Sequence, residues 1–119
     1  MSNVCEHNNI LDICIDAGTS FTLPLLVRMD DGVTPVDITS WQISGSVKQS
    51  IADVTALLAF TGSIVNGISG SAEVMLSPQE TWTLNNVSGA VYDIISREGS
   101  TITRILQGQV SIQPGVTAP

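Results

Sequence analysis

The sequence is poor in the side chains from which catalytic and metal sites are built. Its 119 residues include one histidine and two cysteines, with four basic residues against eleven acidic ones. Aromatic residues make up only 4% of the chain, and it contains no G-x-S-x-G or glycine-rich phosphate-binding motif. An enzyme needs groups that attack a substrate, transfer protons or stabilise charge. The composition therefore predicts that the protein is not an enzyme and carries no cofactor.

The shortage of basic residues excludes two classes of partner. The formal net charge is −7, whereas a nucleic-acid-binding surface needs clustered Lys and Arg that displace counterions from phosphates. An anionic membrane repels an acidic chain for the same reason. No hydrophobic run approaches the ~20 residues of a transmembrane helix, and the first residues lack the regions of a signal peptide. We therefore expect a protein made in the cytoplasm that binds neither nucleic acid nor membrane.

The two cysteines, Cys5 and Cys14, leave three states open: free thiols, one disulfide, or part of a metal site with Glu6 and His7. Structural zinc takes four Cys or His ligands, and this segment supplies three. Disulfides are rare in cytoplasmic proteins. Free thiols are therefore the favoured interpretation, no metal site is predicted, and His7 is interpreted as a solvated residue of an N-terminal arm.

The chain does contain the alternation of apolar and polar residues that is typical of half-buried β-strands. The strongest example runs from Phe21 to Met29, where every second residue is hydrophobic. Because Pro24 cannot donate a hydrogen bond to a neighbouring strand, this strand should lie at a sheet edge or carry a bulge. Further strands are predicted at residues 10–16, 41–48, 54–61, 72–76, 91–96 and 101–112, although the segment 56–59 also allows a helix.

One helix start and one strand irregularity stand out from this pattern. Ser77, Pro78 and Glu80 form a capping-box sequence, which predicts a short helical turn near residues 78–84. In the last strand, Gly108 is predicted to mark a bulge or bend.

The few large and basic side chains have ordinary structural interpretations. Trp41 is in phase with Ile43 along a predicted strand, which favours a core anchor over a ligand platform. Trp82 is expected to close one end of the core. Arg97 and Arg104 are expected to pair with acidic residues on the surface.

Short strands with turns about every 8–12 residues predict an all-β protein. The expected fold is an antiparallel β-sandwich, Ig-like or jelly-roll-like, with the single helical turn described above. We divide the chain into an N-terminal arm at 1–9, one β-sandwich domain at 10–112 and a C-terminal tail at 113–119.

Several segments resemble small structural proteins of tailed bacteriophages and prophages. The similar runs are DAGTSFTLPL at 16–25, DG at 31–32 with PVDIT at 35–39, LSPQET at 76–81, YDI at 92–94 and RILQGQVSIQPGVT at 104–117. The resemblance spans nearly the whole chain from residue 16 to residue 117. It implies a β-sandwich component of a virion and transfers no catalytic residue.

The charge favours one position within a virion. Packaged DNA repels an acidic protein, so we expect a capsid decoration (cement) protein on the outer head surface. The alternatives are a tail, baseplate or fibre-attachment component, or a cellular carbohydrate- or protein-binding β-sandwich module. The expected partners are the major capsid protein or tail proteins, together with further copies of the chain.

Contacts with those partners are expected at the chain ends and at one sheet edge. A decoration protein works through repeated arm and edge contacts, which multiply a modest affinity, rather than through one deep pocket. The expected contact residues are Met1, Ser2, Asn3, Val4, Pro24, Pro114, Val116 and Pro119.

Overall fold

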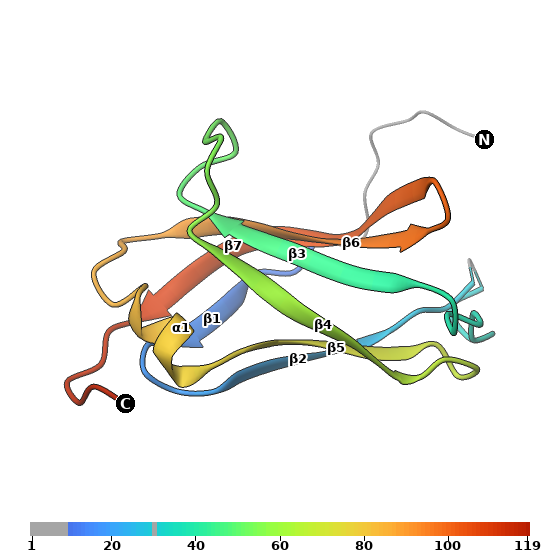
Figure 1. Cartoon of the computed structure of the whole chain (residues 1–119), viewed down its shortest axis with the longest axis horizontal. Helices are drawn as coiled ribbons and strands as arrows, with labels where there is room; N and C mark the ends of the chain where they lie inside the picture. Colours follow the sequence, from blue (N-terminus) through green and yellow to red (C-terminus); the bar gives the residue numbers. More distant parts are fainter. Residues whose placement is uncertain (1–9, 30) are drawn as a thin grey trace.

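A computed structural model describes residues 10–29 and 31–119, and these form seven β-strands and one short helix (Figure 1). The strands are β1 (Ile13–Asp16), β2 (Phe21–Leu26), β3 (Gln42–Lys48), β4 (Leu58–Asn66), β5 (Ser71–Leu76), β6 (Ala90–Glu98) and β7 (Thr101–Gln113), and α1 (Pro78–Trp82) lies between β5 and β6. The prediction of an all-β protein is confirmed.

All seven strands belong to one sheet, in the order β1-β7-β6-β3-β4-β5-β2. The sheet curls until it is nearly closed into a barrel, with β1 and β2 as its two edges (Figure 1). Neighbouring strands are antiparallel except β1 and β7, which run parallel. The prediction of a fully antiparallel arrangement is therefore wrong at this pair, because residue alternation gives the faces of a strand but not its partner or direction. The sandwich type is not confirmed.

The interior of the curled sheet is filled by alternate residues of its strands. On β6, Tyr92 and Ile94 are buried while Asp93 faces outward. Phe60 on β4 lies at the centre of an aromatic row, with ring centroids 6.2 Å from Phe21 and 6.1 Å from Tyr92. Trp41 packs against this core while partly exposed, in agreement with its predicted role as a core anchor.

The helix forms where the capping box predicted it. The Ser77 hydroxyl accepts a hydrogen bond from the Glu80 N–H, and the Glu80 carboxylate accepts one from the Ser77 N–H. The ring of Trp82 then packs on the backbone of Gly18 and Gly115, where an added Cβ would lie 3.1 and 3.2 Å from it. Trp82 thus lies at one end of the barrel, as predicted.

The strand predicted at 54–61 is displaced. β4 begins at Leu58 and extends to Asn66, and residues 49–57 form a loop between β3 and β4. The loop closes at its base, where the Leu57 N–H donates to the Val47 carbonyl at 2.7 Å. The apolar side chains of the loop, which produced the strand prediction, are exposed instead of buried.

The bulge predicted at Gly108 lies at Ile105. Ile94 and Ile95 on β6 pair with Leu106 and Arg104, so Ile105 is the extra residue on β7. Gly108 has a different role, because an added Cβ there would lie 2.1 Å from the carbonyl oxygen of Leu11. The glycine allows the segment leading into β1 to cross close to β7.

Pro24 lies on β2, which pairs with β5 alone and forms an edge of the sheet. The edge position predicted from Pro24 is therefore confirmed. β2 ends at Leu26, three residues before the predicted end of the strand.

Candidate functional site

The side chains of the described residues form no candidate metal site. No three or more His, Cys, Asp or Glu side chains in this part of the chain lie close enough to hold a metal ion. Asp31 accepts hydrogen bonds from the Thr34 hydroxyl and from the N–H groups of Thr34 and Val33, which lower the pKa of Asp31 to about 2. Hydrogen bonds from Thr39 lower the pKa of Asp37 in the same way. These carboxylates stabilise turns.

The described residues contain a single short helix. With five residues, α1 falls far short of a membrane span, and the described part of the chain forms no other helix that could serve as one.

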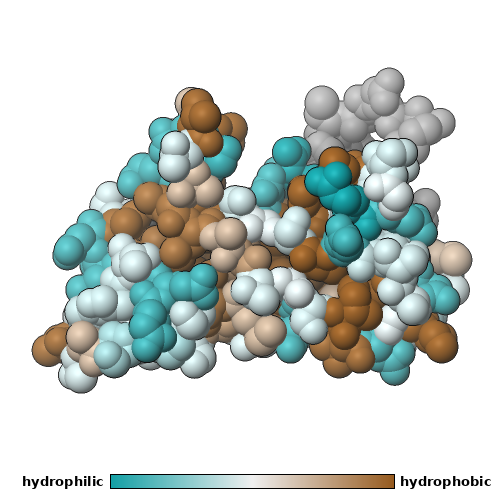
Figure 2. Space-filling model, viewed as in Figure 1, coloured by the Kyte–Doolittle hydropathy of each residue, from teal (hydrophilic) through white to brown (hydrophobic). Residues whose placement is uncertain are grey.

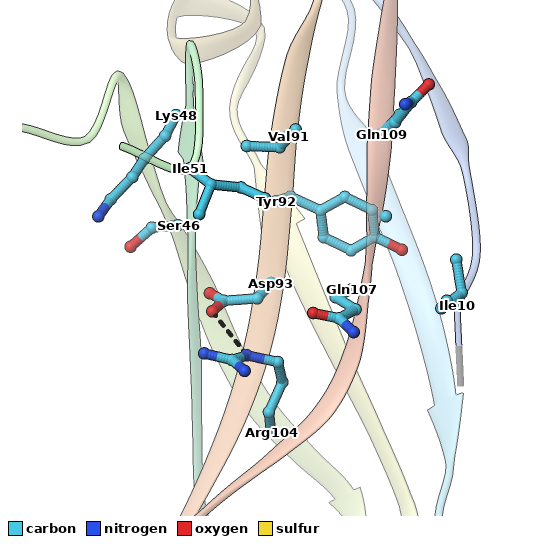
Figure 3. Close-up of a pocket in the computed structure, with 11 residues that line it drawn as sticks. Ile10, Ser46, Lys48, Ile51, Val91, Tyr92, Asp93, Arg104, Gln107 and Gln109 are labelled. Atoms are coloured by element: carbon cyan, nitrogen blue, oxygen red, sulfur yellow. Dashed lines mark hydrogen bonds and ion pairs between the residues drawn. The ribbon is translucent and has the colours of Figure 1, made fainter. Parts of the chain in front are cut away.

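A groove of about 630 Å³ lies on the outer face of β3, β6 and β7 (Figure 3). Ile51 of the 49–57 loop and Ile10, which precedes β1, contribute hydrophobic side chains to its lining. The strands supply Ser46, Lys48, Val91, Tyr92, Asp93, Arg104, Gln107, Gly108 and Gln109. The lining therefore combines hydrophobic side chains with polar and charged ones.

The bulge in β7 determines which side chains face this groove. Arg104 pairs with Ile95 before the bulge, and Gln107 pairs with Asp93 after it. Ile95 and Asp93 both face outward, so Arg104 and Gln107 do as well, although an odd spacing of three would put them on opposite faces of a regular strand. Sequence reasoning missed the groove because no feature of the sequence marks Ile105 as the bulged residue.

The outer face of β3, β6 and β7 concentrates the positive charge of an acidic molecule. Lys48, Arg97 and Arg104, three of the four basic residues, lie on these strands, and Asp93 is the one acidic residue in the groove lining. Arg104 donates from Nε to Asp93 Oδ2 at 3.1 Å, which confirms the predicted pairing of Arg104 with a surface acid. Among the described residues neither Arg97 nor Lys48 forms an ion pair, so the prediction for Arg97 is not confirmed.

Hydrophobic side chains are exposed on loops in two further places. Ile51 and Val54 are 86% and 95% exposed on the 49–57 loop, which projects from the body with hydrophobic residues at its tip (Figure 2). Met29, Val33 and Ile68 are exposed on the loops at the other end of the sheet. We call these three residues the turn-end cluster.

The predicted contact residues are distributed over three regions. Met1, Ser2, Asn3 and Val4 lie outside the described residues, as do Cys5, Glu6 and His7. Pro24 is exposed on the β2 edge, and Pro114, Val116 and Pro119 are exposed on the tail. The tail backbone is held by its own domain, since the Gly115 N–H donates to the Asn85 side-chain oxygen at 2.7 Å.

Of the two cysteines, the structure describes Cys14 only. Cys14 is a free thiol exposed on β1. Its proposed disulfide or metal partners fall in the segment that the structure does not describe.

Comparison with known proteins adds no further information on function. The sequence matches no protein-family model and no curated protein. The function must therefore be inferred from the residues and surfaces described above.

Proposed function

We propose that the protein is a structural component of a tailed-bacteriophage virion, specifically a decoration protein bound to the outer surface of the capsid. The proposal begins from the segments between residues 16 and 117 that resemble such proteins. In this chain a nearly closed sheet stands where those phage proteins are expected to have an Ig-like or jelly-roll-like β-sandwich. The loops at the ends of the sheet are available for contact.

The observation that best supports this role is the exposure of hydrophobic side chains at separate places on the molecule. Val54 on the 49–57 loop and Val33 in the turn-end cluster are 95% and 77% exposed. Patches of exposed hydrophobic side chains mark sites of contact with other macromolecules. A small protein with several such places is suited to binding more than one neighbour at once, which raises its overall affinity.

The net charge of −7 supports a position outside the capsid shell. Packaged DNA repels an acidic protein, whereas the outer surface of a head does not expose DNA. The same argument allows a tail, baseplate or fibre-attachment component.

A cellular carbohydrate-binding module is less consistent with the aromatic residues. Such a module needs aromatic side chains on its surface. Phe60 and Tyr92 are buried, and Phe21, Trp41 and Trp82 are partly buried. The five aromatic residues of the chain therefore provide no exposed row.

Quantitative mass spectrometry of purified particles from the infected or induced host tests the proposal. Copy numbers on the order of hundreds per particle support a head protein. A copy number that is a small multiple of the number of subunits in a symmetric ring supports a tail component. Absence of the protein from the particles would contradict both roles.

A further inference from the structure

The 49–57 loop carries hydrophobic side chains that its own domain does not cover. Ile51 and Val54 are 86% and 95% exposed, and Leu57 at the base is 39% exposed. The hydrogen bond from the Leu57 N–H to the Val47 carbonyl closes the base of the loop. A loop closed in this way presents its tip as a defined projection, and covering the tip would remove apolar surface from water.

The tip of the loop also carries a single negative charge. Asp53 lies between Ile51 and Val54 in the sequence, and among the described residues it forms no ion pair. A surface that receives this loop must therefore offer both apolar contact and a positive charge.

The neighbouring groove offers both apolar surface and a positive charge. Lys48 lies in its lining without an ion-pair partner among the described residues, while Arg104 is already engaged with Asp93. Ile10, which is 61% exposed, and Val91 supply apolar surface in the same lining. Lys48 is therefore the cation that remains available to Asp53, and Ile10 and Val91 are the groups that remain available to Val54.

The loop and the groove are also adjacent, because Ile51 belongs to both (Figure 3). In a two-fold dimer each contact is made twice, so the interface must be complementary to itself. An apolar, negatively charged projection beside an apolar, positively charged hollow meets this requirement within one compact area.

We infer that two copies of the chain associate about a two-fold axis, with the 49–57 loop of each copy in the groove of the other. Val54 of one copy then contacts Ile10 and Val91 of the second, and Asp53 pairs with Lys48 across the interface. This inference does not depend on the virion role, because the dimer is a property of the purified protein.

Sedimentation velocity of the full chain over a series of concentrations tests the apolar contact. We expect a monomer–dimer equilibrium that Val54→Asp weakens at least about tenfold in Kd, since it buries a charge at the centre of the interface. Val33→Asp is the matched control, because Val33 is exposed on a loop outside the proposed interface, and it should leave Kd unchanged. Thermal unfolding followed by circular dichroism verifies that both variants fold.

A charge exchange between two copies tests the reciprocal geometry. Asp53→Lys and Lys48→Asp should each abolish dimer formation, since each homodimer would contain two like-charge contacts. A mixture of the two variants restores opposite charges at both contacts, so it should form a heterodimer. Glu98→Lys, at the end of β6, is the control for the change in net charge and should dimerise like the wild type.

Three results would overturn the inference. The first is a wild-type protein that stays monomeric at concentrations up to about 1 mM, which corresponds to negligible affinity. The second is a dimer that Val54→Asp leaves intact. The third is a mixture of the two charge variants that fails to associate.

Discussion

At the scale of single residues, Thr81 connects the helix to the turn between β1 and β2. Its side chain is fully buried. Its hydroxyl accepts a hydrogen bond from the Gly18 N–H at 3.0 Å and donates one to the Thr19 carbonyl at 2.7 Å. Two segments about sixty residues apart in the sequence are thus held together by one side chain.

Thr81→Val should lower the free energy of unfolding by about 1–3 kcal/mol, because it leaves the partly buried Gly18 N–H without its acceptor. Urea denaturation measures the change. Thr83→Val is the matched control, since the Thr83 hydroxyl bonds the Glu80 carbonyl at an exposed site. Equal effects of the two substitutions would show that the buried hydrogen bonds do not stabilise this end of the barrel.

Tyr92 connects the core to the segment that precedes β1. Its hydroxyl donates to the Leu11 carbonyl. Burial, with a smaller contribution from the negative charge of Asp12, raises the pKa of Tyr92 from 10.0 to about 12. The folded protein therefore keeps a proton that the unfolded chain loses near pH 10. The corresponding stability is complete below pH 10 and is lost as the pH rises towards 12.

Tyr92→Phe should cost about 0.5–1.5 kcal/mol at neutral pH, because it removes a hydrogen bond while preserving the packing of the ring. The variant should also lose less stability than the wild type between pH 10 and 12. Urea denaturation at a series of pH values measures both effects. A parallel decline of the two proteins would contradict the link between Tyr92 ionisation and alkaline unfolding.

At the scale of elements, the parallel pair of β1 and β7 depends on the close crossing at Gly108. The Leu11 N–H donates to the Gln107 carbonyl at 2.8 Å, and the Asp12 carboxylate accepts from the Gln109 N–H at 3.0 Å. Both contacts flank Gly108, whose missing side chain leaves room for the Leu11 carbonyl.

Gly108→Ala should lower the free energy of unfolding by about 1–3 kcal/mol, because the new methyl group forces two backbone segments apart. Amide hydrogen exchange should accelerate at Leu11 in particular. Gly89→Ala is the control, since an added Cβ there meets no atom within 4 Å. Unchanged exchange at Leu11 would show that β1 adapts without leaving β7.

The elements also show what could be predicted from the sequence. Alternation predicted the strands other than β4, which is displaced, because half-buried strands need alternation, and the capping box predicted α1 because its hydrogen bonds are local. The pairing of β1 with β7 and the bulge at Ile105 were not predictable, since both depend on contacts between distant segments. The groove followed from the bulge and from the position of Ile10, so it was missed for the same reason.

At the scale of the whole molecule, the two sets of exposed hydrophobic loop residues lie at opposite ends of the sheet. The described chain measures 45 × 30 × 25 Å along its principal axes. The 49–57 loop follows the end of β3, whereas the turn-end cluster lies on the loops at the opposite end of the sheet (Figure 1). Two different contacts, one between copies of the chain and one with a capsid neighbour, can therefore form without competing.

If the turn-end cluster contacts the capsid, the double substitution Val33→Asp with Ile68→Asp should reduce the copies per purified particle at least about tenfold, because it places two charges in an apolar interface. Quantitative mass spectrometry of the particles measures the loss, and sedimentation should show an unchanged dimer. Val116→Asp tests the alternative contact through the C-terminal tail, since Val116 is 98% exposed there. If only Val116→Asp reduced incorporation, the tail rather than the turn-end cluster would form the capsid contact.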